Sequence, residues 1–224
     1  LAVPPSPMRN SQKSIWSEIR KFGPIFRAPV FIRMAPAIAT LNALHFTYQG
    51  LWLGPWLRDV AGLEDGMRAI TLLFYALGVM FGNLIAGNIT SLLQARGKSP
   101  MIVPIVAMFA MLAMQVLILL VAPRDAWLVT LMWLAFSLSG STSSAAYSSL
   151  AQAFPAQLAG RVSTAVNGSM LALVFVFQSM IGALLDLWPR TASGGWNSAG
   201  YAWAMVATII FQAATMLWMW RRRP

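Results

Sequence analysis

Apolar residues along the chain gather in six long runs, which short polar connectors separate. A helix needs about 20 mostly apolar residues to cross a bilayer, because each residue rises about 1.5 Å and the hydrocarbon core is about 30 Å thick. Each run is long enough, so the pattern predicts an all-α integral membrane protein with six transmembrane helices. The predicted spans are about 34–56, 68–93, 101–122, 127–153, 162–188 and 201–220.

The segments outside these runs are too short to hold a soluble domain. Residues 1–33 form a predicted cytoplasmic linker, in which 11–21 is either a short interfacial helix or an ordinary lead-in. Residues 34–220 form the predicted bundle, and 221–224 form a basic cytoplasmic tail. The chain starts with Leu1 rather than methionine, so we expect a processed product or a piece of a longer protein.

Composition excludes several other classes of protein. Of the 224 residues, 58% are hydrophobic and only 10% are charged, whereas a soluble domain has roughly 45–50% apolar and about 25% charged residues. This apolar content excludes a disordered chain. The absence of cysteine excludes a disulfide scaffold, a thiol nucleophile and a cysteine-ligated metal.

The formal net charge of +10 is distributed unevenly along the predicted topology. With both ends in the cytoplasm, 12 lysines and arginines fall on the cytoplasmic side and 4 on the other. Only Glu18 among the acidic residues falls on the cytoplasmic side. This bias is the positive-inside pattern of membrane proteins. It supports an even number of spans, a lipid bilayer as partner and no nucleic-acid partner.

A few polar residues inside the spans are candidates for a substrate cavity. Asn42, His45 and Gln49 follow at i, i+3 and i+7, and Asn167 and Gln178 lie eleven apart, so each set shares one helix face. These faces either line a cavity or make hydrogen bonds between helices, and the sequence leaves both interpretations open. The full set of cavity candidates is Asn42, His45, Gln49, Tyr75, Asn83, Tyr147, Asn167 and Gln178.

The same spans indicate which chemistry to expect. No Asp or Glu lies near mid-membrane, where a proton relay usually has one, so proton coupling in this chain would run through His45 or lie elsewhere. We expect no enzyme, because one histidine and many serines form neither a hydrolase motif nor a metal-ligand cluster. We expect no cofactor and no metal. A cavity lined by amide, Trp and Tyr side chains would suit a neutral, zwitterionic or amphipathic solute.

Other patterns predict how the helices pack. Gly78, Gly82 and Ala86 lie four residues apart, which favours a close helix–helix approach. The serine-rich run within 127–153 predicts close packing with sliding or bending of the helix. The spans 101–122 and 201–220 are apolar nearly all round, so we expect them to face lipid.

Two connectors carry short motifs. In the first, Gly87-Asn88-Ile89-Thr90 is followed by Arg96-Gly97-Lys98; in the second, Phe154-Pro155 is followed by Gly160-Arg161. With six spans and both ends cytoplasmic, these motifs resemble one half of a major facilitator superfamily (MFS) transporter. The first motif resembles the loop signature G-x-L-x-D-R-x-G-R-[RK], although Thr90 or Ser91 fills its acidic position and extra residues separate Gly87 from Arg96.

The resemblance implies a secondary active transporter of which this chain is the C-terminal half. The family fold implies a missing N-terminal half, a small-molecule substrate held between the halves and alternating access. It also implies a bacterial inner membrane location and a cavity lined by the first, second, fourth and fifth spans. The gating-loop candidates are Gly87, Arg96, Gly97, Lys98, Gly160 and Arg161. The alternative is a non-transporting membrane sensor or assembly subunit with the same fold.

Overall fold

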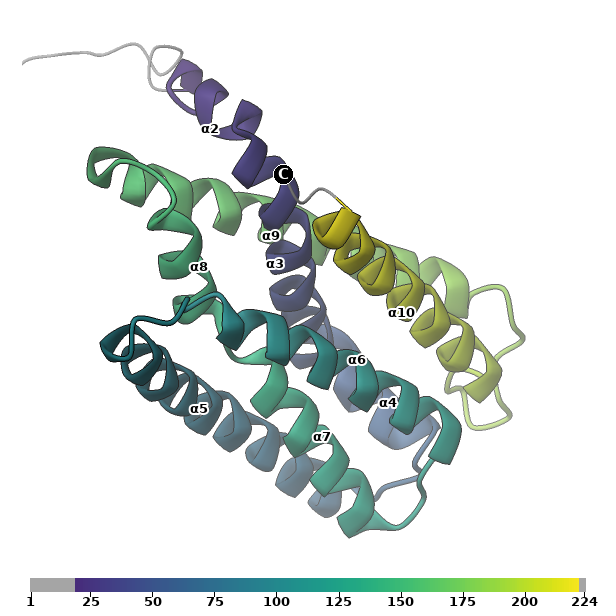
Figure 1. The fold of residues 1–224 in the computed structure, drawn as a ribbon. Helices are drawn as coiled ribbons and strands as arrows, with labels where there is room; N and C mark the ends of the chain where they lie inside the picture. Colours follow the sequence, from purple (N-terminus) through teal and green to yellow (C-terminus); the bar gives the residue numbers. More distant parts are fainter. Residues whose placement is uncertain (1–18, 222–224) are drawn as a thin grey trace, which may run out of the picture.

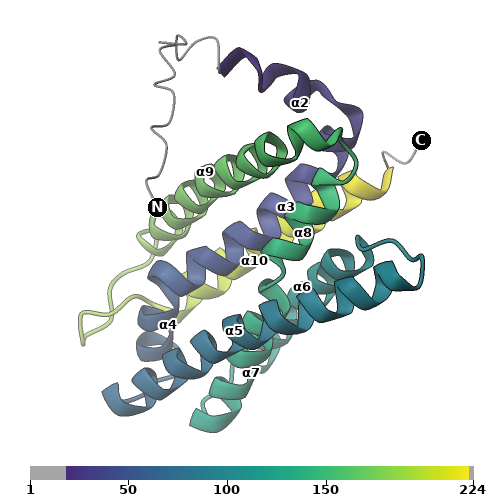
Figure 2. The same ribbon diagram turned by 90° about the vertical axis from the view of Figure 1, so that its left-hand side faces the viewer.

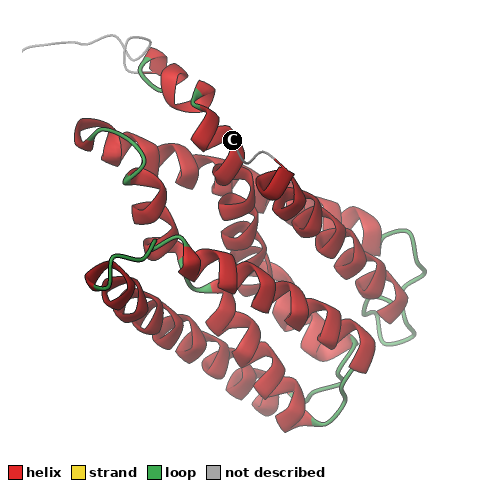
Figure 3. Ribbon diagram, in the orientation of Figure 1, coloured by secondary structure: helices red, strands yellow, loops and turns green. Residues whose placement is uncertain are grey.

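The computed structural model describes residues 19–221, and every regular element in that range is a helix (Figures 1 and 3). Four helical segments are long and apolar enough to cross a membrane, namely Asp65–Ala95, Ile102–Val121, Ala156–Leu185 and Ser198–Arg221. The prediction of an all-α membrane protein is therefore confirmed. The elements are α2 (Gly23–Arg27), α3 (Pro29–Thr47), η1 (Tyr48–Trp52), α4 (Leu53–Asp59), α5 (Asp65–Ala95), α6 (Ile102–Val121), α7 (Ala126–Gly140), α8 (Ser143–Ala151), η2 (Ala156–Leu158), α9 (Ala159–Leu185) and α10 (Ser198–Arg221).

The other two predicted spans are not continuous α-helices, which corrects the sequence analysis. The run 34–56 is divided by η1, a five-residue π-helical turn, and the run 127–153 is divided at Ser141–Thr142. Ser141 Oγ donates to the carbonyl of Ser137 at 2.6 Å, and such local bonds compete with and bend a helix. Neither interruption changes the apolar content of the run, so hydropathy alone does not reveal it.

The predicted linker 1–33 is also partly helical. A proline stands in the first turn of both α2 and α3, where its missing N–H would have no helical partner in any case. Helix α3 therefore begins at Pro29, five residues before the predicted start of the first span. The segment 11–21 lies mostly outside the described residues, as do residues 222–224 of the basic tail.

The helical stretches α3–η1–α4, α5, α6, α7–α8, α9 and α10 run in alternating directions, so the connectors between them gather at two ends of the bundle (Figures 1 and 2). Helix α5 packs along α7, α3 packs along α9, and α10 contacts α3, α6 and α9. A Cβ added at Gly82 would lie 2.7 Å from the carbonyl oxygen of Leu138, and one at Gly78 would overlap Ser137. The close approach predicted from these glycines is confirmed.

The connectors separate the charged residues. One end, called the basic end, carries only cations among the described residues: Arg20, Lys21, Arg27, Arg33, Arg96, Lys98, Arg161 and Arg221. The other end, called the acidic end, carries every described acidic residue: Asp59, Glu64, Asp65, Asp125 and Asp186. Three of these carboxylates pair with arginines at the same end, in Arg58–Asp59, Arg68–Asp65 and Arg190–Asp186.

The helices predicted to be apolar nearly all round, α6 and α10, bury a polar cluster between them. Gln115 Nε2 donates to Gln212 Oε1, Gln212 Nε2 donates to the carbonyl of Met108 at 2.9 Å, and Thr208 Oγ1 donates to Gln115 Oε1 at 3.1 Å. We call Gln115, Thr208 and Gln212 the glutamine cluster. The outward sides of both helices still expose Leu120 and Ile210. The prediction therefore holds for the outer faces and was wrong for the inner ones.

Candidate functional site

The two interrupted stretches meet at His45, whose side chain is 2% exposed. The ring of Tyr75 from α5 stacks on the imidazole with centroids 5.4 Å apart. The Tyr75 hydroxyl lies 3.1 Å from His45 Nδ1 and donates to the carbonyl oxygen of His45 at 3.1 Å. Gly140, the last residue of α7, is so close that an added Cβ would lie 2.7 Å from His45 Nδ1. We call His45, Tyr75 and Gly140 the His45 site.

Several buried polar atoms in and beside this site have no hydrogen-bond partner among the described residues. On α3 these are His45 Nε2, Asn42 Oδ1 and Thr47 Oγ1, and at the α7–α8 interruption the atom is Thr142 Oγ1. Asn42 Nδ2, in contrast, donates to the carbonyl of Ile38 at 2.8 Å. An unpaired polar group in an apolar interior is costly, and a bound water or a polar ligand is the usual partner. These atoms are therefore available to form a hydrogen bond with a bound water or a polar ligand.

The π-helical turn η1 divides the predicted polar stripe of the first span. Asn42 and His45, which precede the turn, are buried, whereas Gln49, inside it, is exposed. A π-helical turn has more residues per turn than an α-helix, so the constant 100° step used for the prediction fails from Tyr48 onward. The structure thus brings Asn42 and His45 into one buried face and leaves Gln49 on the surface.

An aromatic wall that the sequence analysis did not identify closes the inner side of the His45 site. The ring of Tyr48 packs against Trp133 and Phe136 of α7 at centroid distances of 5.2 and 5.5 Å. Tyr75 also contacts both α7 rings at 6.4 and 6.3 Å. The i, i+3 spacing of Trp133 and Phe136 places them on one face of α7, and this spacing was the signal available in the sequence.

The predicted pair on α9 is also separated. Gln178 is half-buried beside η1. Its backbone carbonyl accepts a hydrogen bond from Trp52 Nε1 at 3.2 Å. Its Nε2 lies 3.5 Å from a Cβ added at Gly50. Asn167 is exposed and eleven residues away, about 16 Å along the helix. Gln178 therefore neighbours the π-helical turn, whereas Asn167 does not.

The remaining cavity candidates, Asn83 and Tyr147, differ in how their polar atoms are paired. Asn83 on α5 is half-buried, and its amide donates to the carbonyl of Val79 at 3.0 Å within its own helix. The hydroxyl of Tyr147 on α8 is buried without a partner. The Tyr147 hydroxyl is thus available to a bound ligand, whereas the amide nitrogen of Asn83 is already paired.

No protein-family model, curated protein or solved structure matches this chain. The resemblance to MFS transporters therefore stays a prediction that rests on the loop motifs and the predicted topology. The chemistry of the site has to be argued from its own residues. Among residues 19–221, no three His, Cys, Asp or Glu side chains lie close enough together to hold a metal ion.

The loop candidates all lie toward the basic end. Arg96 and Lys98 are exposed in the turn after α5, where Gly97 adopts a left-handed φ of 67° that favours glycine. Gly87 lies inside α5 with open space around it, and Gly160 and Arg161 stand at the start of α9. The hydrogen bond that joins the two connectors comes from other residues. It runs from Gln94 Nε2 to Gln152 Oε1 at 3.3 Å.

Proposed function

We propose that this chain crosses the membrane six times and is one half of an MFS-type secondary transporter in a bacterial inner membrane. In this proposal α3–η1–α4 and α7–α8 each cross the membrane as an interrupted helix, beside α5, α6, α9 and α10. The basic end faces the cytoplasm, as the positive-inside rule requires. A second six-helix half packs against this one, and a small solute moves between the two halves by alternating access.

The observation that carries the proposal is the meeting of two helix interruptions at a buried histidine with unpaired polar neighbours. Irregular backbone at membrane depth is tolerated where it is buried in protein or lines a watery cavity. π-Helical turns also occur frequently at functional sites. An interrupted helix can bend at its break, and hinge bending between two states is what alternating access needs. The His45 site combines these properties, which a purely structural bundle does not need.

The same residues indicate the class of substrate. Every described acidic residue lies at the acidic end, and the described lysines and arginines lie in the connectors or near helix ends. The polar atoms left open near His45 are a ring nitrogen, an amide oxygen and hydroxyls, and such groups bind a solute through neutral hydrogen bonds. A neutral, zwitterionic or amphipathic solute fits them best.

The test is solute uptake into proteoliposomes that contain the full-length gene product. Labelled sugars, amino acids, peptides and amphiphilic compounds are offered as separate classes, with and without an imposed proton gradient. We expect one class to be taken up faster than by protein-free vesicles. The variant His45→Ala should lower that uptake at least about tenfold, because it removes the polar centre of the site.

The matched control is Ser193→Ala in the connector before α10, whose exposed hydroxyl lies 3.0 Å from the hydroxyl of Thr191 and belongs to none of the candidate sites. It should keep full uptake. If no class is taken up by a folded protein, the transporter proposal is wrong and a sensor or assembly role is favoured. If His45→Ala keeps full uptake, the His45 site is not the solute path and His45 carries no protons.

A further inference from the structure

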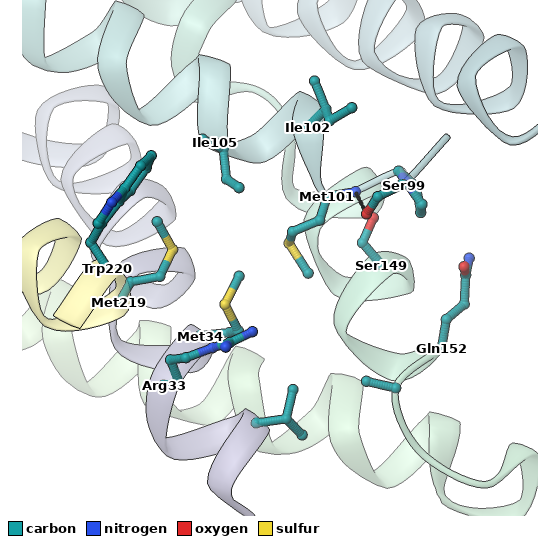
Figure 4. A pocket seen from close by; sticks show the side chains of 13 residues that line it. Arg33, Met34, Ser99, Met101, Ile102, Ile105, Ser149, Gln152, Met219 and Trp220 are labelled. Carbon is teal, nitrogen blue, oxygen red and sulfur yellow. Dashed lines mark hydrogen bonds between the residues drawn. The ribbon is translucent and has the colours of Figure 1, made fainter. Parts of the chain in front are cut away.

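A large pocket lies at the basic end, separate from the His45 site. It has a volume of about 700 Å³ and lies between the start of α3, the start of α6, the end of α8 and the end of α10. This volume is in the range of small-molecule and cofactor sites. Figure 4 shows the Arg33 side chain reaching into it, with Ser149 and Gln152 on one side and Trp220 on the other.

The polar part of the pocket lacks protein partners. Arg33 Nε and Ser149 Oγ are both buried and make no hydrogen bond within the described residues. All described acidic residues lie at the acidic end, so none of them neutralises Arg33. A guanidinium group with free donors is a preferred partner of phosphate oxygens. A phosphate group in this pocket would satisfy Arg33, and Ser149 would donate a second hydrogen bond.

An apolar groove on the outside of the bundle borders this pocket at Trp220. It has a volume of about 410 Å³, lies between α6 and α10, and shares Trp220 with the pocket. Its other residues are Phe109, Leu112, Ala213, Met216 and Leu217. Phe109 and Leu217 are 51% and 58% exposed, so the groove opens on the outer surface.

The length of this combined site matches a lipid. From Ile102 in the pocket to Leu112 in the groove, α6 advances ten residues, which is about 15 Å. That is about half of the 30 Å hydrocarbon core, the depth of one leaflet. A polar site at the membrane surface beside an apolar groove, together about one leaflet deep, fits a headgroup and the upper part of its acyl chain.

We propose that this pocket and groove bind an anionic phospholipid from the leaflet at the basic end. The lipid phosphate contacts Arg33 and Ser149, and one acyl chain lies in the groove between α6 and α10. Clusters of lysine and arginine attract anionic lipids to such a surface. The site depends on the membrane character of the chain and not on solute transport, so either proposal can fail without the other.

The test is lipid titration of the delipidated full-length protein in non-ionic detergent, followed by native mass spectrometry. The probes are dioleoylphosphatidylglycerol, dioleoylphosphatidylcholine and inorganic phosphate. We expect the anionic lipid to bind about tenfold more tightly than phosphatidylcholine, because it adds a net charge that Arg33 can pair with. The variant Arg33→Gln should remove this preference. Arg221→Gln, at an exposed arginine of the same end, should change it less than about twofold.

The groove is tested by filling it. Ala213→Leu should weaken binding of both lipids several-fold, because its side chain occupies the space of the acyl chain. Ala207→Leu is the matched control, since it makes the same change on α10 in a separate groove beside Leu184 and Trp203. Thermal unfolding verifies that each variant is folded, and Arg33→Met, which removes the charge but keeps an apolar stem, replaces Arg33→Gln if that protein does not fold.

Three results would overturn the proposal. The first is equal binding of the two lipids, and the second is an equal effect of Arg33→Gln and Arg221→Gln. The third is displacement of phosphatidylglycerol by inorganic phosphate alone, which would assign the pocket to a free phosphate compound.

Discussion

The glutamine cluster and the His45 site both bury polar groups between helices, but they differ in how many of these groups are paired. In the glutamine cluster, both side-chain amides and the Thr208 hydroxyl bond to a neighbouring group. At or beside the His45 site, His45 Nε2, Asn42 Oδ1 and Thr142 Oγ1 bond to no atom of the described residues. A cluster whose polar groups are all paired can only hold α6 and α10 together. A site with unpaired polar groups can also bind a water or a polar ligand.

The two regions also differ in whether their helices are continuous. Helices α6 and α10, which hold the glutamine cluster, are uninterrupted over 20 and 24 residues. The His45 site lies between the π-helical turn η1 and the break that follows Gly140. Rigid, saturated helices favour one arrangement, and interrupted helices with unsaturated groups allow two. We therefore assign stability to the first region and function to the second.

The largest effect on stability should come from Gln212→Leu in the glutamine cluster. The substitution leaves Gln115 Nε2 and the carbonyl of Met108 without their buried partner, which should cost about 3 kcal/mol of unfolding free energy. The double variant Gln115→Leu/Gln212→Leu replaces both partners and should recover most of this loss. Unfolding in mixed micelles measures both. A double variant as unstable as the single one would show that pairing is not what matters.

Gly140→Ala should have the next largest effect, through the His45 site. The new methyl group would lie within 3.0 Å of three side-chain atoms of His45, including its Cβ, so a ring rotation alone cannot relieve the overlap. We expect a loss of about 2 kcal/mol, measured by thermal unfolding. Gly87→Ala on α5 meets open space and should be neutral or slightly stabilising. If both changes have the same effect, α7 does not press on His45.

Tyr75→Phe and Thr208→Val compare the two regions directly, since each removes one buried hydroxyl. Thr208→Val should cost about 1 kcal/mol and leave solute uptake unchanged, because its partner Gln115 belongs to a structural cluster. Tyr75→Phe should also cost about 1 kcal/mol, because it removes the hydrogen bond to the carbonyl of His45, and it should lower uptake. The opposite result, with uptake sensitive to Thr208 and not to Tyr75, would reverse the assignment of the two regions.

The smallest effect concerns Asp59 at the acidic end, whose side chain is 4% exposed. Burial favours its neutral form, but hydrogen bonds from Arg58, the Trp196 N–H and the Tyr201 hydroxyl outweigh this and lower the pKa of Asp59. Because the pKa of Asp59 is lower in the folded protein than in the unfolded chain, its carboxylate stabilises the fold at pH values above the unfolded pKa of about 3.9. This stabilisation is lost as the pH falls through the folded pKa.

Asp59→Asn should therefore reduce stability at neutral pH by somewhat less than about 1 kcal/mol and flatten its decline below about pH 4. Unfolding curves at several pH values measure this. Asp65→Asn is the control, because Asp65 is paired with Arg68 but is 93% exposed, and exposed pairs contribute little. An unchanged pH profile in Asp59→Asn would show that Asp59 does not tie the loop at Trp196 to α4.

Much of the fold follows from local sequence, and the candidate site follows from it only in part. The runs ending at Ala95 and Val121 are apolar along their whole length, so their helices were predictable within a few residues. The spacing of Gly78 and Gly82 likewise predicted the close contact of α5 with α7. The exposure of Gln49 and Asn167 was not predictable, because constant helical spacing does not extend through a π-helical turn or state which neighbour covers a face.

The sequence by itself determined that this protein is helical, apolar and charged mainly at the ends of its helices, because these properties depend on composition and on the length of apolar runs. Only the tertiary structure decided that Gln115 finds Gln212, that His45 lies against Gly140, and that Arg33 faces a pocket without a counter-charge. Those pairings join residues far apart in the chain. They depend on how helices pack and where they break, and hydropathy carries no information about either.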